Sequence, residues 1–143
     1  HLASMTGLMN VLLERYGGEI NEGDLFVAND PHVAGGTHLP DINMAMPVFH
    51  EGGLKGFVCN IAHHADVGGA ARGSMSGGLF EIWQEGLRIP VVKLMTKGTI
   101  NEEIFEILLL NMRLRDERKG DLNAQIAACR LGDRKSTRLN SSH

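Results

Sequence analysis

The sequence lacks the features that would point to a membrane or to a nucleic acid. Its longest purely apolar runs span a few residues, far short of the ~20 that a membrane helix needs. The 143 residues carry a formal net charge of −3, with no basic patch and no long run of like charge. We therefore expect no membrane and no nucleic acid among the partners.

Cysteine is scarce, whereas glycine is abundant. Cys59 and Cys129 lie far apart and form no CxxC pattern, so we expect reduced, core-type thiols and a cytoplasmic protein. No signal peptide is visible, and a start on His1 rather than Met suggests a fragment. The chain has 18 glycines, and their excess over an ordinary composition sits around two polar clusters, which indicates tight backbone there.

The apolar pattern predicts a mixed α+β fold in a partial domain. Residues 2–16 repeat at helical spacing and are followed by a glycine pair, which predicts an N-terminal helix. Gly23-Asp24 is a turn before a short buried strand at residues 25–28. Two apolar runs at 42–49 and 54–61, joined by a glycine-containing turn, predict an antiparallel hairpin in a sheet.

The C-terminal half predicts one more strand and two helices. Residues 87–95, broken by Pro90, are typical of an edge strand. Asn101 caps the first helix, and the second runs from Asp116 to about Leu131, before Gly132. We expect a domain over residues 1–134, followed by a disordered, non-native tail at residues 135–143.

The first polar cluster is NDPHVAGGTHLPD, residues 29–41, which is too broken to be a helix or a strand. His38 and Asp41 stand three residues apart in a proline-constrained loop, so a nitrogen and an oxygen ligand can face one point. Asp30 precedes Pro31, which disfavours helical backbone, and its carboxylate is expected to project from a strand end. A turn-forming role is the alternative for Asp30.

The second cluster is AHHADVGG, residues 62–69, which the hairpin returns towards the first. His63 or His64 would supply a second nitrogen ligand, and Asp30 or Asp66 a second oxygen ligand. Neighbouring strand residues face opposite sides, so one histidine would be a ligand or acid–base group and the other a hydrogen-bonded supporting residue. Asp66 also fits a role in orienting a ligand or in a turn. The set suits a catalytic Zn, Mn or Fe ion.

Several blocks in the same order resemble the hydantoinase B/oxoprolinase family and span residues 1 to about 132. They are HLASM, NDPHVAGGTHLPDI, AHHADVGG, EIWQEGLRIPVVKL and NMRLRDERKGDLNAQIAA. The resemblance implies an N-terminal piece of the B part of an ATP-dependent amidohydrolase that opens lactam or hydantoin rings. One such enzyme is the 5-oxoprolinase of glutathione metabolism. Acetone and acetophenone carboxylase large subunits are related to this family.

The resemblance also implies partners, cofactors and roles. A hydantoinase A-type subunit or domain would bind ATP and phosphorylate a small cyclic amide, and this chain would complete the hydrolysis within a hetero-oligomer. A divalent metal (Zn, Mn or Fe) would be held by His38, Asp41 and His63, with Asp30 as a candidate fourth ligand. Beyond the resemblance, we expect His64 or Asp66 to position protons during attack by water. We expect the fragment alone to be inactive.

Two other functions fit the same residues. In the carboxylase branch the metal would steady an enolate that attacks activated CO₂. In a non-catalytic role, the two clusters would only stabilise the interface with the A subunit. Alanine at His38 or Asp41 would then alter assembly and leave turnover per assembled complex unchanged.

Overall fold

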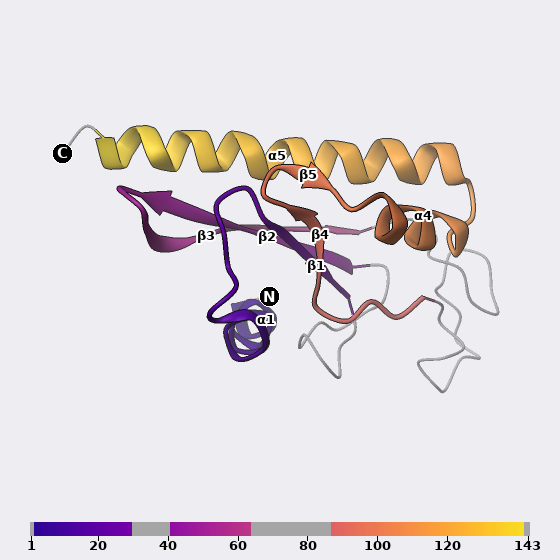
Figure 1. Ribbon diagram of the computed structural model, residues 1–143. Coiled ribbons are helices and arrows are strands. Elements are labelled where there is room, and N and C mark those ends of the chain that lie inside the picture. Colours follow the sequence, from indigo (N-terminus) through magenta and orange to yellow (C-terminus); the bar gives the residue numbers. More distant parts are fainter. Residues whose placement is uncertain (1, 30–40, 64–86, 142–143) are drawn as a thin grey trace.

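The computed structural model describes residues 2–29, 41–63 and 87–141. Within these ranges three helices pack on a five-stranded antiparallel sheet of order β3-β2-β1-β4-β5 (Figure 1). The helices are α1 (Leu2–Tyr16), α4 (Glu102–Leu110) and α5 (Arg115–Ser141). The strands are β1 (Leu25–Ala28), β2 (Asp41–His50), β3 (Gly53–His63), β4 (Val92–Thr96) and β5 (Thr99–Ile100). The α+β class expected from the sequence is confirmed.

The sheet lies between two helical layers, with α1 on one face and α4 and α5 on the other (Figure 1). Leu8 and Leu12 of α1 pack against Phe26 and Ala28 of β1. The larger core lies on the other face and contains Leu25, Val27, Ile42, Met44, Phe105, Leu108, Leu122 and Ile126. Because both faces of β1 are covered, all four of its residues are buried, and its sequence is an unbroken apolar run.

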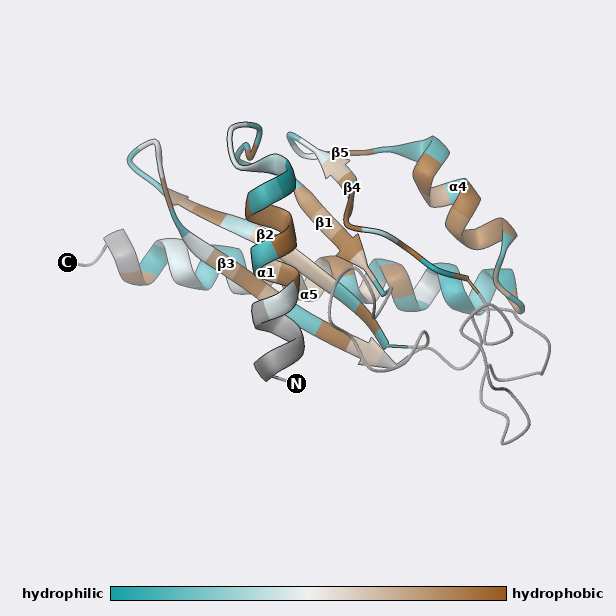
Figure 2. Ribbon diagram, turned by 90° about the horizontal axis from the view of Figure 1, so that it is seen from below, coloured by the Kyte–Doolittle hydropathy of each residue, from teal (hydrophilic) through white to brown (hydrophobic). Residues whose placement is uncertain are grey.

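The N-terminal helix, the first strand and the hairpin form where the sequence predicts them. The β2–β3 turn has positive φ at both Glu51 (51°) and Gly52 (79°). A two-residue turn of this handedness matches the twist of the strands, which fixes the register of the long hairpin. Along β3, Figure 2 shows hydrophobic stretches interrupted by hydrophilic residues.

The predicted edge position of residues 87–95 is wrong. Pro90 lies before the strand, and β4 begins only at Val92. β4 pairs with β1 on one side and with the two-residue β5 on the other, so it is the second strand from the edge. A turn with positive φ at Lys97 (50°) and Gly98 (87°) returns the chain at once and creates β5.

Helix α5 is longer than the sequence predicts. The structure has residues 135–141 in this helix, where disorder was expected. No proline interrupts the segment, and an existing helix extends at one hydrogen bond per residue. Gly132 does not end the helix either. It allows a close approach to β3, since a Cβ at this position would lie 2.7 Å from Val58 Cγ1. The boundary at residue 134 and the non-native origin of the tail stay predictions.

Candidate functional site

The end of β1, the start of β2 and the end of β3 meet at one end of the sheet. In the strand register Ala28, the last residue of β1, is opposite Asn43, close to the start of β2. The first residue of β2, Asp41, is opposite the last residue of β3, His63. The segments that contain the two polar clusters therefore leave the described structure from neighbouring positions, as the predicted hairpin requires (Figure 1).

Two of the four predicted metal ligands are described, and the register places them directly opposite each other. Asp41 is partly buried and takes part in an electrostatic or hydrogen-bond contact. Directly opposite positions of an antiparallel pair share one face of the sheet. By alternation along β2 the Asp41–His63 positions share the face of Ala45, which packs with α1 residues.

The other predicted site residues lie outside the described ranges. These are Asp30, His38, His64 and Asp66. Within the described ranges no group of three or more His, Cys, Asp or Glu residues is placed to hold a metal ion. The described part of the site is thus a pair of cross-strand positions, those of Asp41 and His63.

Two asparagines fix the strand ends beside this pair. Asn43 is buried, and its Nδ2 donates to the carbonyl oxygens of Ala28 (3.3 Å) and Asp41 (3.4 Å). Asn29 is fully buried; its Oδ1 accepts from the backbone N of Ile89 at 2.5 Å, and its Nδ2 donates to the carbonyl oxygen of Leu87 at 2.9 Å. Residues 87–89 are thereby tied to the end of β1.

Sequence reasoning missed these roles. It treated Asn29 only as the start of a loop and gave no role to Asn43. A polar residue inside or directly after an apolar strand is the available signal, because a buried amide must find partners for both its donor and its acceptor. The partners themselves lie 58 and 60 residues away along the chain, at Leu87 and Ile89.

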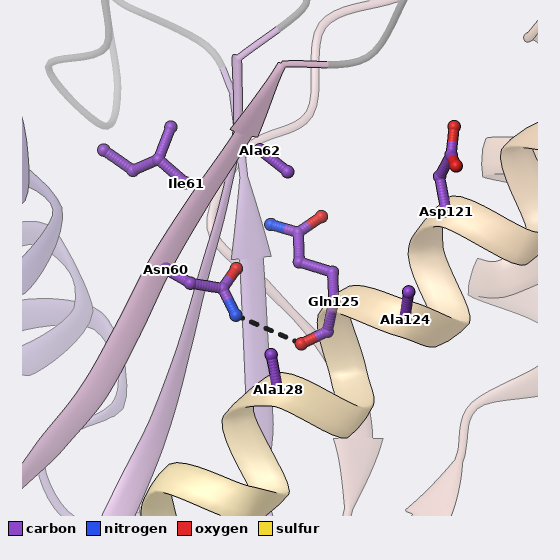
Figure 3. Close-up of a pocket in the computed structure, with 7 residues that line it drawn as sticks. All are labelled: Asn60, Ile61, Ala62, Asp121, Ala124, Gln125 and Ala128. Atoms are coloured by element: carbon purple, nitrogen blue, oxygen red, sulfur yellow. Dashed lines mark hydrogen bonds between the residues drawn. The ribbon is translucent and has the colours of Figure 1, made fainter.

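A cleft with both polar and apolar lining lies on the opposite face of the sheet, between β3 and α5 (Figure 3). It has a volume of about 440 Å³ and is lined by Asn60, Ile61, Ala62, Asp121, Ala124, Gln125 and Ala128. Asn60 Nδ2 donates to the carbonyl oxygen of Gln125 at 3.1 Å, and Gln125 Nε2 donates to that of Ile42 at 2.7 Å. These bonds hold α5 to the same strand ends that carry the candidate pair.

The two cysteines are free thiols, as expected from the sequence. Burial raises the pKa of Cys59 above its ordinary value. Burial, with the nearby Cys59 as a smaller cause, raises the pKa of Cys129 to about 12. Cys129 Sγ also accepts a hydrogen bond from Asn60 Nδ2 at 3.1 Å. Burial disfavours the thiolate, which is the nucleophilic and metal-binding form. Cys129 packs in the larger core and Cys59 against the smaller one.

Among the described residues, no helix combines the length and the apolar character needed to cross a membrane.

The chain belongs to the hydantoinase B/oxoprolinase family, whose sequence profile matches residues 1–143. It is 41% identical over 134 residues to the caprolactamase subunit beta of Pseudomonas jessenii, covering 94% of this chain and 23% of that protein. It is 40% identical over 144 residues to 5-oxoprolinase 1 of Arabidopsis thaliana, covering 92% of this chain and 11% of that protein. The chain therefore spans less than a quarter of the length of these relatives.

Solved structures show the same fold. The crystal structure of ATP-dependent caprolactamase from Pseudomonas jessenii superposes with a TM-score of 0.93 at 39% identity, over 100% of this chain and 24% of that one. A nucleotide-free acetone carboxylase superposes with a TM-score of 0.92 at 23% identity, over 100% of this chain and 19% of that one. At 23% identity, the likeness to acetone carboxylase is evidence of a shared fold only.

Proposed function

We propose that this chain is part of the metal-binding catalytic region of an ATP-dependent enzyme that opens cyclic amides of the hydantoin or 5-oxoproline type. The observation that carries the proposal is the register that sets Asp41 opposite His63. Asp41 is the last residue of the first polar cluster, and His63 is near the start of the second. The relatives named caprolactamase and 5-oxoprolinase support a cyclic amide as substrate.

The residues present fit a divalent metal. A carboxylate and an imidazole at facing positions are an oxygen and a nitrogen donor of the kind that Zn, Mn and Fe accept. His38 lies three residues before Asp41, and Asp30 follows the anchored Asn29, so both are proposed to complete the set. When bound, the metal would polarise an amide carbonyl or acidify a water molecule.

The chain's own residues would supply position and proton transfer. We assign acid–base work to His64 or Asp66, since His64 directly follows His63 and Asp66 lies three residues after it. Asn43 holds the backbone of Ala28 and Asp41 together, which fixes the strand ends that flank the site. A hydantoinase A-type subunit or domain would phosphorylate the amide oxygen with ATP, making the carbonyl carbon easier for water to attack.

The proposal includes a hetero-oligomer in the cytoplasm. The name of the caprolactamase subunit beta indicates that this relative has a partner subunit. The free thiols Cys59 and Cys129 are consistent with a reducing compartment.

Metal content tests the site. In the full-length protein, Asp41→Asn and His63→Ala should each lower the bound metal per protein, and affinity should fall by on the order of 100-fold. His50→Ala is the matched control, because His50 lies on the same hairpin at its opposite end, paired with Gly53. Unchanged metal content in Asp41→Asn and His63→Ala would overturn the assignment.

Product analysis tests the reaction. The full-length protein with its A-type partner should convert 5-oxoproline, a hydantoin or caprolactam to the ring-opened acid in step with ATP hydrolysis. A carboxylated product from a ketone, with no ring-opened acid, would support the carboxylase function instead. If Asp41→Ala altered assembly but left turnover per assembled complex unchanged, the clusters would serve only the subunit interface.

A further inference from the structure

The outer edge of β3 is the long open edge of the described sheet. β3 has eleven residues and pairs only with β2, whereas the other edge strand, β5, has two residues. In an antiparallel pair, every second residue of an edge strand directs its N–H and C=O groups away from its partner. These backbone groups form a row along the side of β3 that no described strand covers.

This edge carries little of the protection that natural proteins give to open strands. Such protection usually consists of charges, prolines or bulges. β3 contains one charged residue, Lys55, and no proline. The register shift of the hairpin lies opposite the turn end of β3, between Val48 and Phe49, so pairing from Phe57 to Ile61 is regular. A regular and largely apolar edge is suited to pairing with a further strand.

The cleft between β3 and α5 continues this edge. It exists because Ala62, Ala124 and Ala128 present only methyl groups where β3 and α5 face each other (Figure 3). Asn60 lies at its wall, with Nδ2 bonded to the Gln125 carbonyl. In the described part of the chain, Asn60 Oδ1 is buried and has no hydrogen-bond partner. A buried acceptor without a partner is costly, so this oxygen marks the place of a missing donor.

We propose that an extended segment of the longer polypeptide adds to the open edge of β3 as a sixth strand. Its backbone pairs with the outward groups of residues 57–61. One of its side chains enters the cleft and donates a hydrogen bond to Asn60 Oδ1. The occupant is assigned to the same polypeptide because the caprolactamase that shares this fold has three quarters of its chain beyond the matched part. The inference does not depend on the proposed metal or reaction.

Hydrogen exchange of the full-length protein tests the pairing. Amides at residues 57–61 should all be protected, and the outward-facing alternate amides should exchange at least ~100-fold more slowly than unpaired ones. Exchange of these alternate amides at the unpaired rate would overturn the proposal. Protection that appears only at high protein concentration, or only with the partner subunit, would assign the occupant to a second copy or to that subunit and would also overturn it.

A pair of α5 variants tests the cleft. Ala124→Leu fills the cleft from the helix, so it should speed exchange of the outward amides by about tenfold while the amides bonded to β2 stay protected. Ala127→Leu is the control, because Ala127 is exposed on the same helix and does not line the cleft. Equal exchange in the two variants would show that no side chain occupies the cleft.

Discussion

Both ends of β1 carry a fully buried polar side chain, but the two side chains differ in charge. Asp24 precedes β1, and Asn29 follows it. The Asp24 carboxylate is surrounded by donors: Lys93 Nζ lies 2.9 Å from Oδ2. The backbone nitrogens of Asn21 and Lys97 donate to Oδ2 at 2.8 Å and to Oδ1 at 2.9 Å. Lys93 Nζ also donates to the carbonyl oxygen of Glu19 at 2.6 Å, so both members of this ion pair have additional hydrogen bonds.

The Asn29 end is closed by an uncharged amide. Its donor and its acceptor both bond to backbone atoms of residues 87–89. The carboxylate of this region, Asp41, stands instead at the start of β2, where it is only partly buried. The Asp24 carboxylate is enclosed by donors and stabilises the fold. The Asp41 position, at a strand start opposite His63, is the one that suits the ligand role proposed above.

Removing the Asp24 carboxylate should have the largest effect on this comparison. Asp24→Ala leaves Lys93 without its carboxylate and two backbone N–H groups without acceptors, so the free energy of unfolding should fall by about 3–5 kcal/mol. Asp24→Asn keeps one acceptor oxygen and should lose less. Urea unfolding followed by circular dichroism measures both, and a loss below 1 kcal/mol for Asp24→Ala would show that the ion pair is dispensable.

Two glycines at the Asp24 end separate a clash from a backbone preference. Gly23 and Gly98 both have φ of +87°, but a Cβ at Gly23 would lie 2.6 Å from the backbone N of Gly98, whereas one at Gly98 meets nothing within 4 Å. Gly98→Ala should therefore cost about 1–2 kcal/mol from the left-handed backbone alone. Gly23→Ala should cost about 3 kcal/mol or more, since the two turns must also move apart. Equal losses in thermal unfolding would remove the clash as a cause.

At the other end, Asn29→Ala should lower the free energy of unfolding by about 2–3 kcal/mol, because the Ile89 N–H and the Leu87 carbonyl lose their partner. Asn29→Asp keeps the acceptor for Ile89 but cannot donate to Leu87, and it replaces a buried amide with a carboxylate, whose burial is costly. It should be no more stable than Asn29→Ala. If Asn29→Asp matched the wild type in urea unfolding, the two ends of β1 would be interchangeable.

The smallest effect at neutral pH concerns Cys129, which is buried in the larger core. The folded state raises its pKa from 9.0 to about 12. Above pH 9 the unfolded chain therefore binds fewer protons than the folded one, and stability falls as pH rises from 9.0 towards about 12. The wild type should lose more stability than Cys129→Ala between pH 8 and pH 10.5. Parallel urea midpoints for the two proteins over this range would contradict the shift.

Local pattern was enough for much of the fold. The apolar stripe of residues 2–16, the run at 25–28 and the glycine-containing turn after His50 each predict an element that the structure contains. The return of His63 to the region of Asp41 was also predictable. A short turn makes the second strand run antiparallel beside the first, so its last residues come back to the start of the first strand. The edge assignment of residues 87–95 failed because a turn at Lys97 and Gly98 adds a further strand of only two residues.

The sequence by itself determined the family, the α+β class and the pairing that brings Asp41 to His63, because these depend on motifs, periodicity and one short turn. Only the tertiary structure decided which polar side chains are buried. The sequence pattern predicts a turn at Asp24 and the start of a loop at Asn29, yet both side chains also bond to groups 58 to 73 residues away. Hydrogen bonds over such separations depend on how the layers pack, and no local pattern encodes them.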